Sequence, residues 1–270
     1  MSRTGHIEKC VVMARGLGTR MRQSDLGASL DATQIAAADL GAKAMIPVGR
    51  PFLDYLLSAA ADAGYRRICL VIGPEHDFIR EYYRKLHADR IEISFAVQPI
   101  PMGTANAVLA AAEFAGDDEF VVLNGDNYYS AEALRQVQAL GQPGAVLFDA
   151  AALVSHGVIP EDRINAFASC VIDADGFLAD IVEKANSGAE KEPKVVSMNC
   201  WRFDREIFAA CRDVPLSSRG EYELPSAVIL AMKRGHKVKV VISQTGVLDL
   251  SVRGDIVGVA ERLKNVKVSL

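Results

Sequence analysis

Cysteine is scarce and scattered in this chain of 270 residues, which has five cysteines and no Cys-x-x-C pair. An odd, widely spaced set excludes a disulfide framework and argues against a zinc site. No apolar run approaches the about 20 residues of a membrane-spanning helix, and the polar N-terminus lacks the apolar core of a signal peptide. No block of five consecutive Lys or Arg occurs, and the formal net charge is −4. These absences predict a cytoplasmic protein that binds neither membrane nor nucleic acid.

What is present is the composition of a folded globular protein. Hydrophobic residues make up 50% of the chain and charged residues 24%, which excludes a wholly disordered protein. A length of 270 residues suits one large α/β domain or two smaller ones. Because no linker-like stretch divides the chain, we expect a single domain over residues 1–270.

Short strands alternate with helices in the first half of the chain. Runs rich in Val, Ile and Phe predict strands at residues 9–13, 67–72, 91–97, 120–123 and 145–148. Apolar residues at helical spacing predict helices at residues 51–63, 74–87, 104–114 and 131–140. This alternation predicts a mainly parallel sheet that is covered by helices. Ligands of such sheets bind beyond the carboxyl ends of the strands, so the residues that follow each strand form the candidate site.

The second half of the chain has a different pattern. Strands at residues 167–172 and 177–182, joined by a turn at Asp175 and Gly176, predict a β-hairpin. The remaining elements predicted there are strands at 195–203 and 237–242, a helix at 224–234 and an exposed loop at 186–194. In the first half, the Ala-, Ser- and Asp-rich residues 23–40 predict either a short helix or a mobile loop.

A turn that contains two glycines follows the first predicted strand. Gly16 and Gly18 let the backbone approach a ligand and turn its amides outward, which is typical of phosphate binding. Thr19 adds a hydroxyl donor and Arg20 a permanent cation. A dinucleotide-binding fingerprint needs a glycine where Met21 stands, and the Gly-Lys-Ser/Thr of a P-loop is missing. Two glycines alone are also typical of an ordinary turn between a strand and a helix.

Further segments supply the other groups that a nucleoside triphosphate requires. Lys43, before a predicted amphipathic helix, provides a second cation. Gln98 has both an amide donor and an acceptor, as recognition of a nucleobase edge requires. Gly103 would let the base lie close to the backbone, and we expect Thr104 to cap the helix that follows. Asp126 comes after a strand and carries hard carboxylate oxygens of the kind that magnesium prefers.

In this order, the segments resemble the sugar nucleotidyltransferases, also called nucleoside-diphosphate-sugar pyrophosphorylases. The shared motifs are Gly-Leu-Gly-Thr-Arg-Met, a Lys before Met-Ile-Pro-Val-Gly, Gly-Thr-Ala, Gly-Asp, Val-Glu-Lys, Asn-Cys-Trp-Arg-Phe, Glu-Tyr-Glu-Leu and Leu-Asp. They run from about Val11 to past Asp249, and eight motifs in family order are far more specific than any one of them. The branch that makes thymidine- or uridine-diphospho-sugars is the most similar, through Gln98-Pro99 and the Tyr128-Tyr129 pair.

The resemblance implies a reaction and a role for each matched residue. An oxygen of a sugar 1-phosphate would attack the α-phosphorus of a nucleoside triphosphate, pyrophosphate would leave, and Mg²⁺ would be the cofactor. The implied catalytic residues are Arg20, Lys43, Asp126 and Lys184. The implied nucleotide-binding residues are Ala14, Gly16, Gly18, Thr19, Gln98, Gly103, Thr104 and Gly125. The implied sugar-phosphate residues are Glu183, Lys184 and Asn199, and the implied Mg²⁺ ligands are Asp126 and Asp249, on opposite sides of the cleft.

The resemblance also implies a fold and an organisation. We expect a three-layer, Rossmann-like nucleotidyltransferase fold with a mixed, mainly parallel sheet and helices on both faces. The N-terminal half would bind the nucleotide and the C-terminal half the sugar phosphate, and a homo-oligomer is possible. Residues 23–40 would form a mobile flap over the triphosphate. The cations expected to gather around that triphosphate are Arg15, Arg20, Lys43 and Lys184.

The chain departs from the family pattern at several positions. Arg15 stands where the family usually has Ala or Gly, and Ala44 replaces a common proline. Ala168 replaces a sugar-contacting glycine, and the Gly and Thr usual after the second aspartate are Ser251 and Val252. Two alternatives therefore stay open: a cytidylyl- or guanylyltransferase for another phosphorylated alcohol, and a catalytically weakened, nucleotide-binding regulatory protein.

Overall fold

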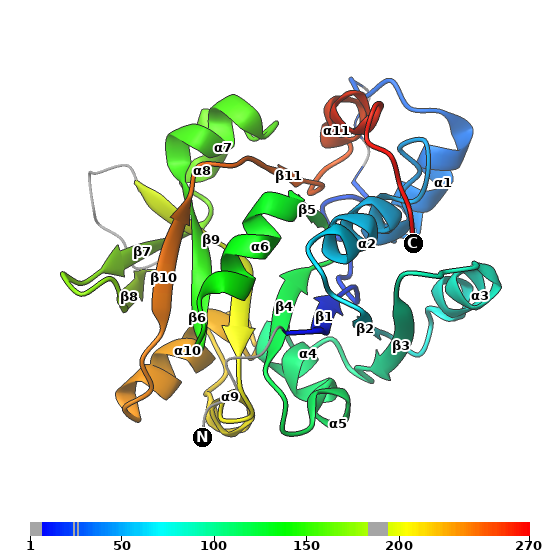
Figure 1. Ribbon diagram of the computed structural model, residues 1–270. Coiled ribbons are helices and arrows are strands. Elements are labelled where there is room, and N and C mark those ends of the chain that lie inside the picture. Colours follow the sequence, from blue (N-terminus) through cyan, green and yellow to red (C-terminus); the bar gives the residue numbers. More distant parts are fainter. Residues whose placement is uncertain (1–6, 24, 26, 183–193) are drawn as a thin grey trace.

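The computed structural model describes residues 7–23, 25, 27–182 and 194–270. The strands of its main sheet are β1 (Lys9–Met13), β2 (Arg67–Ile72), β3 (Glu92–Val97), β4 (Phe120–Asn124), β6 (Gly144–Asp149), β7 (Ala168–Ile172), β8 (Leu178–Val182), β9 (Val195–Phe203) and β10 (Lys239–Ser243). Their order across the sheet is β10-β6-β9-β4-β1-β2-β3, with the β7–β8 hairpin attached to β9 (Figure 1).

Strand direction divides this sheet into two parts. The strands β3, β2, β1 and β4 are mutually parallel, and β10 is parallel to β6. Between them β9 runs antiparallel to both β4 and β6. Met13 at the end of β1 pairs with Val71 and Asn124, so the carboxyl ends of three neighbouring strands meet at one edge. The mixed, mainly parallel sheet confirms the α/β fold class that the sequence predicts.

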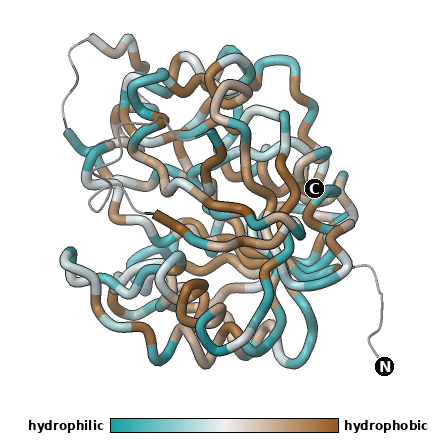
Figure 2. Tube along the Cα trace, turned by 90° about the vertical axis from the view of Figure 1, so that its left-hand side faces the viewer, coloured by the Kyte–Doolittle hydropathy of each residue, from teal (hydrophilic) through white to brown (hydrophobic). Residues whose placement is uncertain are grey.

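Helices cover both faces of the sheet. They are α2 (Phe52–Asp62), α3 (Asp77–Lys85), α4 (Thr104–Ala110), α5 (Ala112–Ala115), α6 (Ala131–Ala139), α7 (Ala150–His156), α8 (Glu161–Ile164), α9 (Ile207–Asp213) and α10 (Leu224–Lys233). Residues of α2, α3 and α6 share a buried cluster with Cys10 and Val12, whereas α4, α9 and α10 share another with Val11 and Met13. Successive residues of β1 therefore point to opposite helical layers, and hydrophobic segments gather between those layers (Figure 2).

A smaller unit joins the two ends of the chain. Strand β5 (Asn127–Tyr129) pairs antiparallel with β11 (Val247–Asp249). A third apolar cluster brings together α1 (Ala32–Asp39), the start of α2 and α11 (Asp255–Leu263). Figure 1 shows α11 beside α1 and α2, although it lies near the opposite end of the chain. This packing carries Asp249 to the end of β4.

Some elements differ from the sequence prediction. The helix predicted at residues 104–114 is two helices, α4 and α5, which Ala111 separates. Residues 23–40 contain the short helix α1, whose N-cap Asp31 accepts hydrogen bonds from the backbone N–H groups of Thr33 and Gln34. The short strands β5 and β11 and helices α7, α8, α9 and α11 were not evident from hydrophobic periodicity. Apart from Lys194, the loop predicted at 186–194 lies outside the described residues.

None of the helices in the described part of the chain is long and apolar enough to cross a membrane.

Candidate active site

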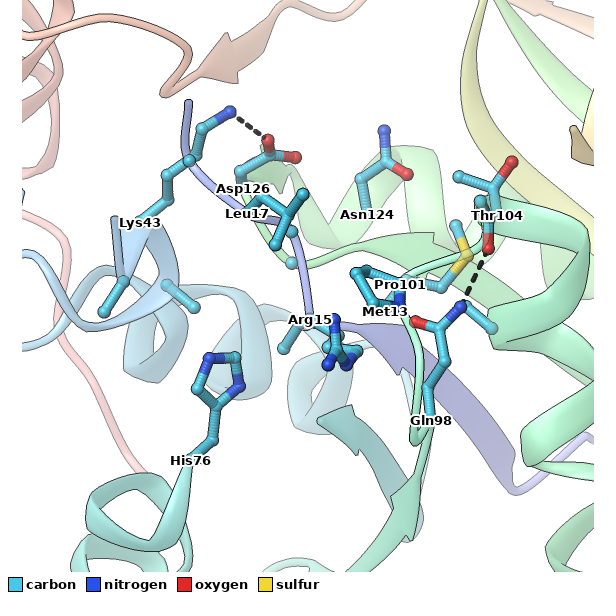
Figure 3. Close-up of a pocket in the computed structure, with 18 of the residues that line it drawn as sticks. Met13, Arg15, Leu17, Lys43, His76, Gln98, Pro101, Thr104, Asn124 and Asp126 are labelled. Carbon is cyan, nitrogen blue, oxygen red and sulfur yellow. Dashed lines mark hydrogen bonds and ion pairs between the residues drawn. The ribbon is translucent and has the colours of Figure 1, made fainter. Parts of the chain in front are cut away.

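A cavity of about 390 Å³ opens where the parallel strands end. Residues that follow β1, β3 and β4 line it, together with Lys43, because the strand register brings these chain segments to one edge of the sheet (Figure 3). Most residues that the sequence implicates are among its lining: Ala14, Gly16, Gly18, Thr19, Arg20, Lys43, Gln98, Gly103, Thr104, Gly125, Asp126 and Asn199. Asp249 is buried and is not among the lining residues, and Glu183 and Lys184 lie outside the described residues.

The turn after β1 has a conformation and packing that require glycine at one position. Gly18 has a φ of +60°, and a Cβ there would lie 2.3 Å from the carbonyl oxygen of Gly41. Both the left-handed backbone and the close approach therefore exclude a larger residue. Thr19 and Arg20 follow it and are exposed, and Arg20 makes no ion pair with any described residue. The turn thus presents at the cavity a cation that pairs with none of the described carboxylates.

An ion pair joins the second cation to the first predicted metal ligand. The Nζ atom of Lys43 lies 2.8 Å from Oδ2 of Asp126, and the two side chains are 13% and 31% exposed. Lys43 begins a single 3₁₀ turn, in which the N–H of Ile46 donates to its carbonyl oxygen. The backbone of Asp126 is also held, because the N–H of Leu250 donates to its carbonyl oxygen at 2.9 Å. The backbone of each charged residue is therefore held by a hydrogen bond, to a near neighbour for Lys43 and to a distant segment for Asp126.

Asp249, in β11, lies near Asp126, which is in the turn between β4 and β5. Asp249 is opposite Asn127, the residue that follows Asp126, in the β5–β11 pair. The geometry follows from the antiparallel pairing, which the sequence does not reveal. Burial, and then the charge of Asp126, raise the pKa of Asp249, whereas Arg163, a hydrogen bond from Ser251 and then Lys43 lower it. Arg163 also donates a hydrogen bond to Asp249.

This pair of carboxylates has the donor chemistry of a magnesium site. Two neighbouring hard anions repel each other, and a divalent cation between them would relieve that repulsion. Within the described residues, no group of three or more His, Cys, Asp or Glu could hold a metal ion. The described residues would therefore supply two carboxylates, and Mg²⁺ ordinarily completes its octahedron with water and substrate phosphates.

The Gln98 side chain has a defined orientation. Its Nε2 donates to the carbonyl oxygen of Gly103 at 3.0 Å and to Oδ1 of Asn106 at 2.8 Å (Figure 3 shows this side of the cavity). Because both partners are acceptors, that end of the amide is the nitrogen, and Oε1 is the atom that can accept from a ligand. Gly103 has a φ of +99°, and a Cβ there would lie 2.5 Å from the carbonyl oxygen of Tyr222.

Thr104 has a different structural role from the one that the sequence predicts. The N-cap of α4 is Gly103, and Thr104 is the first residue of the helix. Its Oγ1 accepts a hydrogen bond from the N–H of Leu224 at 2.8 Å. The hydroxyl therefore satisfies the N-terminus of α10, a helix that is adjacent only in space.

Arg15 lines the same cavity as Arg20 and Lys43, and its guanidinium is paired there with a carboxylate. Its Nη2 lies 3.2 Å from the Glu75 carboxylate and donates to the carbonyl oxygen of Pro99 at 3.2 Å. His76 also lines the cavity and was missed by sequence reasoning, although it follows a predicted strand. The N–H of Gly73 donates to Nδ1 of His76 at 3.2 Å, and burial lowers the pKa of this imidazole.

Asn124 and Glu221 also line the cavity. Asn124 directly precedes the Gly-Asp motif and Glu221 begins the Glu-Tyr-Glu-Leu motif, but the sequence predicted no role for either. Nδ2 of Asn199 donates to Oδ1 of Asn124 at 3.3 Å, and Oδ1 of Asn199 accepts from the Trp201 indole at 2.9 Å. Asn199 has a φ of +55°, a left-handed conformation that asparagine tolerates better than most residues. These contacts hold the side-chain amides of Asn124 and Asn199 against each other at the cavity.

Helix α1 is anchored away from the cavity. Nε2 of Gln34 donates to the carbonyl oxygen of Pro47 at 3.0 Å, and Asp39 pairs with Arg253. No described residue between positions 25 and 40 lines the cavity. Of the two alternatives predicted for residues 23–40, the structure contains the short helix. Its anchoring away from the cavity does not support the predicted flap over the triphosphate.

Comparison with known proteins finds relatives over most of the chain. The family model described as "Nucleotidyl transferase" matches residues 9–249. The chain is 27% identical over 231 residues to a UTP–glucose-1-phosphate uridylyltransferase of Haloferax volcanii, covering 85% of this chain and 86% of that protein. It is 28% identical over 225 residues to a glucose-1-phosphate thymidylyltransferase of Streptomyces antibioticus, covering 82% of this chain and 56% of that protein.

The fold is also that of solved structures. A crystal structure of UDP-glucose pyrophosphorylase complexed with UDP-glucose superposes with a TM-score of 0.77 at 15% identity, covering 97% of this chain and 100% of that one.

Proposed function

The chain belongs to the nucleotidyl transferase family, and we propose that it transfers a nucleotidyl group from a nucleoside triphosphate to a sugar 1-phosphate, releasing pyrophosphate. The observation that carries this proposal is the meeting of separate chain segments in one cavity. The glycine turn with Arg20, the Lys43–Asp126 pair at 2.8 Å and the oriented Gln98 all line it. These groups match the phosphates and the base of one nucleotide.

The transfer needs positioning and charge compensation more than covalent help from the protein. A phosphate oxygen of the sugar 1-phosphate attacks the α-phosphorus, and the bond to the bridging oxygen of pyrophosphate breaks. Arg20 and Lys43 would hold the triphosphate and stabilise the charge that develops on it. A phosphate monoester is already an anion at neutral pH, so the attacking oxygen needs no general base.

We propose Mg²⁺ as the cofactor, with Asp126 and Asp249 as its protein ligands. The proximity of Asp249, at the end of β11, to Asp126, in the turn between β4 and β5, supports this assignment. When bound, Mg²⁺ would neutralise charge on the triphosphate oxygens. Asp126 would hold the ion from the cavity side, while Arg163 keeps the buried Asp249 carboxylate in place.

The Oε1 of Gln98, to which no described residue donates a hydrogen bond, is consistent with a uracil or thymine base. These bases present an N–H at ring position 3, whereas cytosine has a lone pair there. UTP or dTTP is the proposed donor, because cytosine lacks this N–H and the relatives reported above are a uridylyltransferase and a thymidylyltransferase. Asn199 and Glu221, from the C-terminal half, complete the cavity on the proposed sugar-phosphate side. We propose glucose 1-phosphate as the first acceptor to test, because the relatives reported above are named for it.

A pyrophosphate-release screen tests the function directly. Each of UTP, dTTP, CTP, GTP and ATP is combined with a panel of sugar 1-phosphates, with and without Mg²⁺. We expect turnover with UTP or dTTP in the presence of Mg²⁺. Tight triphosphate binding without turnover in any combination would instead favour the regulatory alternative.

The Asp126→Asn variant tests the metal assignment. It should lower Mg²⁺-dependent turnover by about 100-fold or more, with an unchanged melting temperature, because it removes a ligand charge from a pre-formed site. Asp117→Asn is the matched control, since Asp117 pairs only with exposed Arg205 among described residues. Near-normal activity of the Asp126 variant would show that the assignment is wrong.

A further inference from the structure

One cationic side chain of the cavity has hydrogen-bonding capacity that the described protein does not satisfy. Arg15 is 6% exposed and lines the cavity. Its Nη2 has partners in Glu75 and the Pro99 carbonyl oxygen, but its Nε and Nη1 are buried and find no acceptor among the described residues. Buried donors without partners are unfavourable, so an acceptor supplied by a ligand would stabilise this arrangement.

The position of Arg15 places these donors on the base side of the cavity. Its Nη2 is tied to Pro99, the residue that follows Gln98. Figure 3 shows Arg15 between His76 and Pro101, with Gln98 close by, while Lys43 and Asp126 lie on the other side of the cavity. The guanidinium therefore faces the part of the site in which Gln98 offers its free oxygen.

The charges around Arg15 favour a neutral ligand oxygen over a phosphate. A Glu75 carboxylate oxygen lies 3.2 Å from Nη2, which offsets the positive charge and would repel a phosphate. His76 beside them carries its proton on Nε2, because Nδ1 accepts from the N–H of Gly73. Burial lowers the pKa of His76, so at neutral pH the imidazole adds no second positive charge.

We propose, building on the function proposed above, that Arg15 is a specificity-determining residue that donates to a carbonyl oxygen of the nucleobase. Gln98 accepts from the adjacent ring N–H, so the two side chains together read an N–H next to a carbonyl. Uracil and thymine have this edge, whereas cytosine has an amino group beside an unprotonated ring nitrogen. Because Arg15 lines the cavity and its partner Glu75 is half-exposed, a small shift of this pair would bring the unsatisfied donors to the base.

The experiment separates base recognition from phosphate binding. Dissociation constants for UTP, CTP and inorganic tripolyphosphate are measured by calorimetry for the wild type, Arg15→Ala, Arg15→Lys and Arg20→Ala. We expect Arg15→Ala to weaken UTP binding by about 10- to 100-fold, the range of a charged hydrogen bond. Binding of CTP and tripolyphosphate should change by less than about threefold. Arg20→Ala should weaken tripolyphosphate binding along with UTP binding.

Two results would overturn the proposal: an unchanged preference for UTP over CTP in both Arg15 variants, or an equal loss of UTP and tripolyphosphate binding. Should Arg15→Ala fail to fold, Arg15→Lys decides, because it keeps the charge but loses the planar donor fork. It should still lower the preference for UTP.

The outcome is independent of the proposed activity. Wild-type turnover with UTP and an unchanged base preference in the variants would leave the activity intact and remove this role of Arg15. Loss of base preference in a protein that never releases pyrophosphate would establish the role of Arg15 and refute the activity.

Discussion

Lys43 and Asp126 are 83 positions apart in the chain, yet their charged atoms lie 2.8 Å from each other. Both side chains are partly shielded from water, so their attraction exceeds that of a surface ion pair. The sequence around either residue does not show that the two side chains form an ion pair. The single 3₁₀ turn at Lys43 and the end of β4 at Asp126 bring the two charges to the same wall of the cavity.

Lys43→Ala is expected to lower kcat/KM for the nucleoside triphosphate by about 100-fold, because it removes a positioned cation from a partly desolvated site. Steady-state pyrophosphate release measures this effect. Lys85→Ala is the matched control, since the Lys85 side chain is 79% exposed and pairs with Glu81 on the surface of α3. Activity of the Lys43 variant within twofold of the wild type would contradict the assigned role.

At the scale of elements, a buried carboxylate links α2 to α3. Asp54 of α2 is fully buried and accepts hydrogen bonds from the hydroxyls of Tyr82, at 2.8 Å, and Tyr83, at 2.9 Å. Arg50 also donates to it at 3.0 Å. Burial, and then the hydrogen bond to Asp54, raise the pKa of Tyr82 to about 12, so this hydroxyl stays protonated at neutral pH. The network fixes α3, and with it His76 at the cavity wall.

Asp54→Ala is expected to lower the free energy of unfolding by about 3–5 kcal/mol, because it leaves buried hydroxyls and a guanidinium without their acceptor. Urea denaturation measures the change. Asp62→Ala on the same helix should change the free energy of unfolding by about 1 kcal/mol or less, since the Asp62 side chain is 49% exposed in its pair with Arg90. Equal effects of the two substitutions would show that the buried network contributes no more than a surface pair.

For the whole molecule, β9 is the strand that joins the two parts of the sheet. It lies between β4 and β6 and runs antiparallel to both. Its Trp201 and Arg202 are buried, and Arg202 donates to Glu119 at 2.5 Å and to the carbonyl oxygen of Gln138 at 2.7 Å. Because Asn199 is on the same strand, the packing of β9 also places the C-terminal contribution to the cavity.

Arg202→Ala is expected to lower Tm by roughly 6–20 °C, because breaking a buried ion pair leaves the other charge unpaired. Differential scanning calorimetry measures this shift. Arg205→Ala removes an exposed pair with Asp117 and should leave Tm nearly unchanged. The Michaelis constant of the Arg202 variant for the triphosphate, measured well below its Tm, should remain within about twofold of wild type, because Arg202 does not line the cavity.

Local sequence was enough to locate most strands and the helices with a clear apolar face. The strands predicted at residues 9–13, 67–72 and 195–203 have the observed bounds, because each is a buried run of β-branched and apolar residues between polar segments. The two glycines after β1 also predicted the turn there. The structure agrees, because Gly18 has a left-handed backbone conformation that few other residues adopt. Short elements such as β5 and β11 were missed because three residues carry no readable period.

The sequence by itself therefore determined which segments meet the ligand, because a parallel sheet brings the ends of its strands to one edge. Only the tertiary structure decided the partners of individual side chains. It turned Arg15 toward Glu75 and Pro99, and it placed Asp249 beside Asp126. Contacts between residues far apart in the chain depend on how layers pack and strands pair, and a local pattern of polar and apolar residues contains neither.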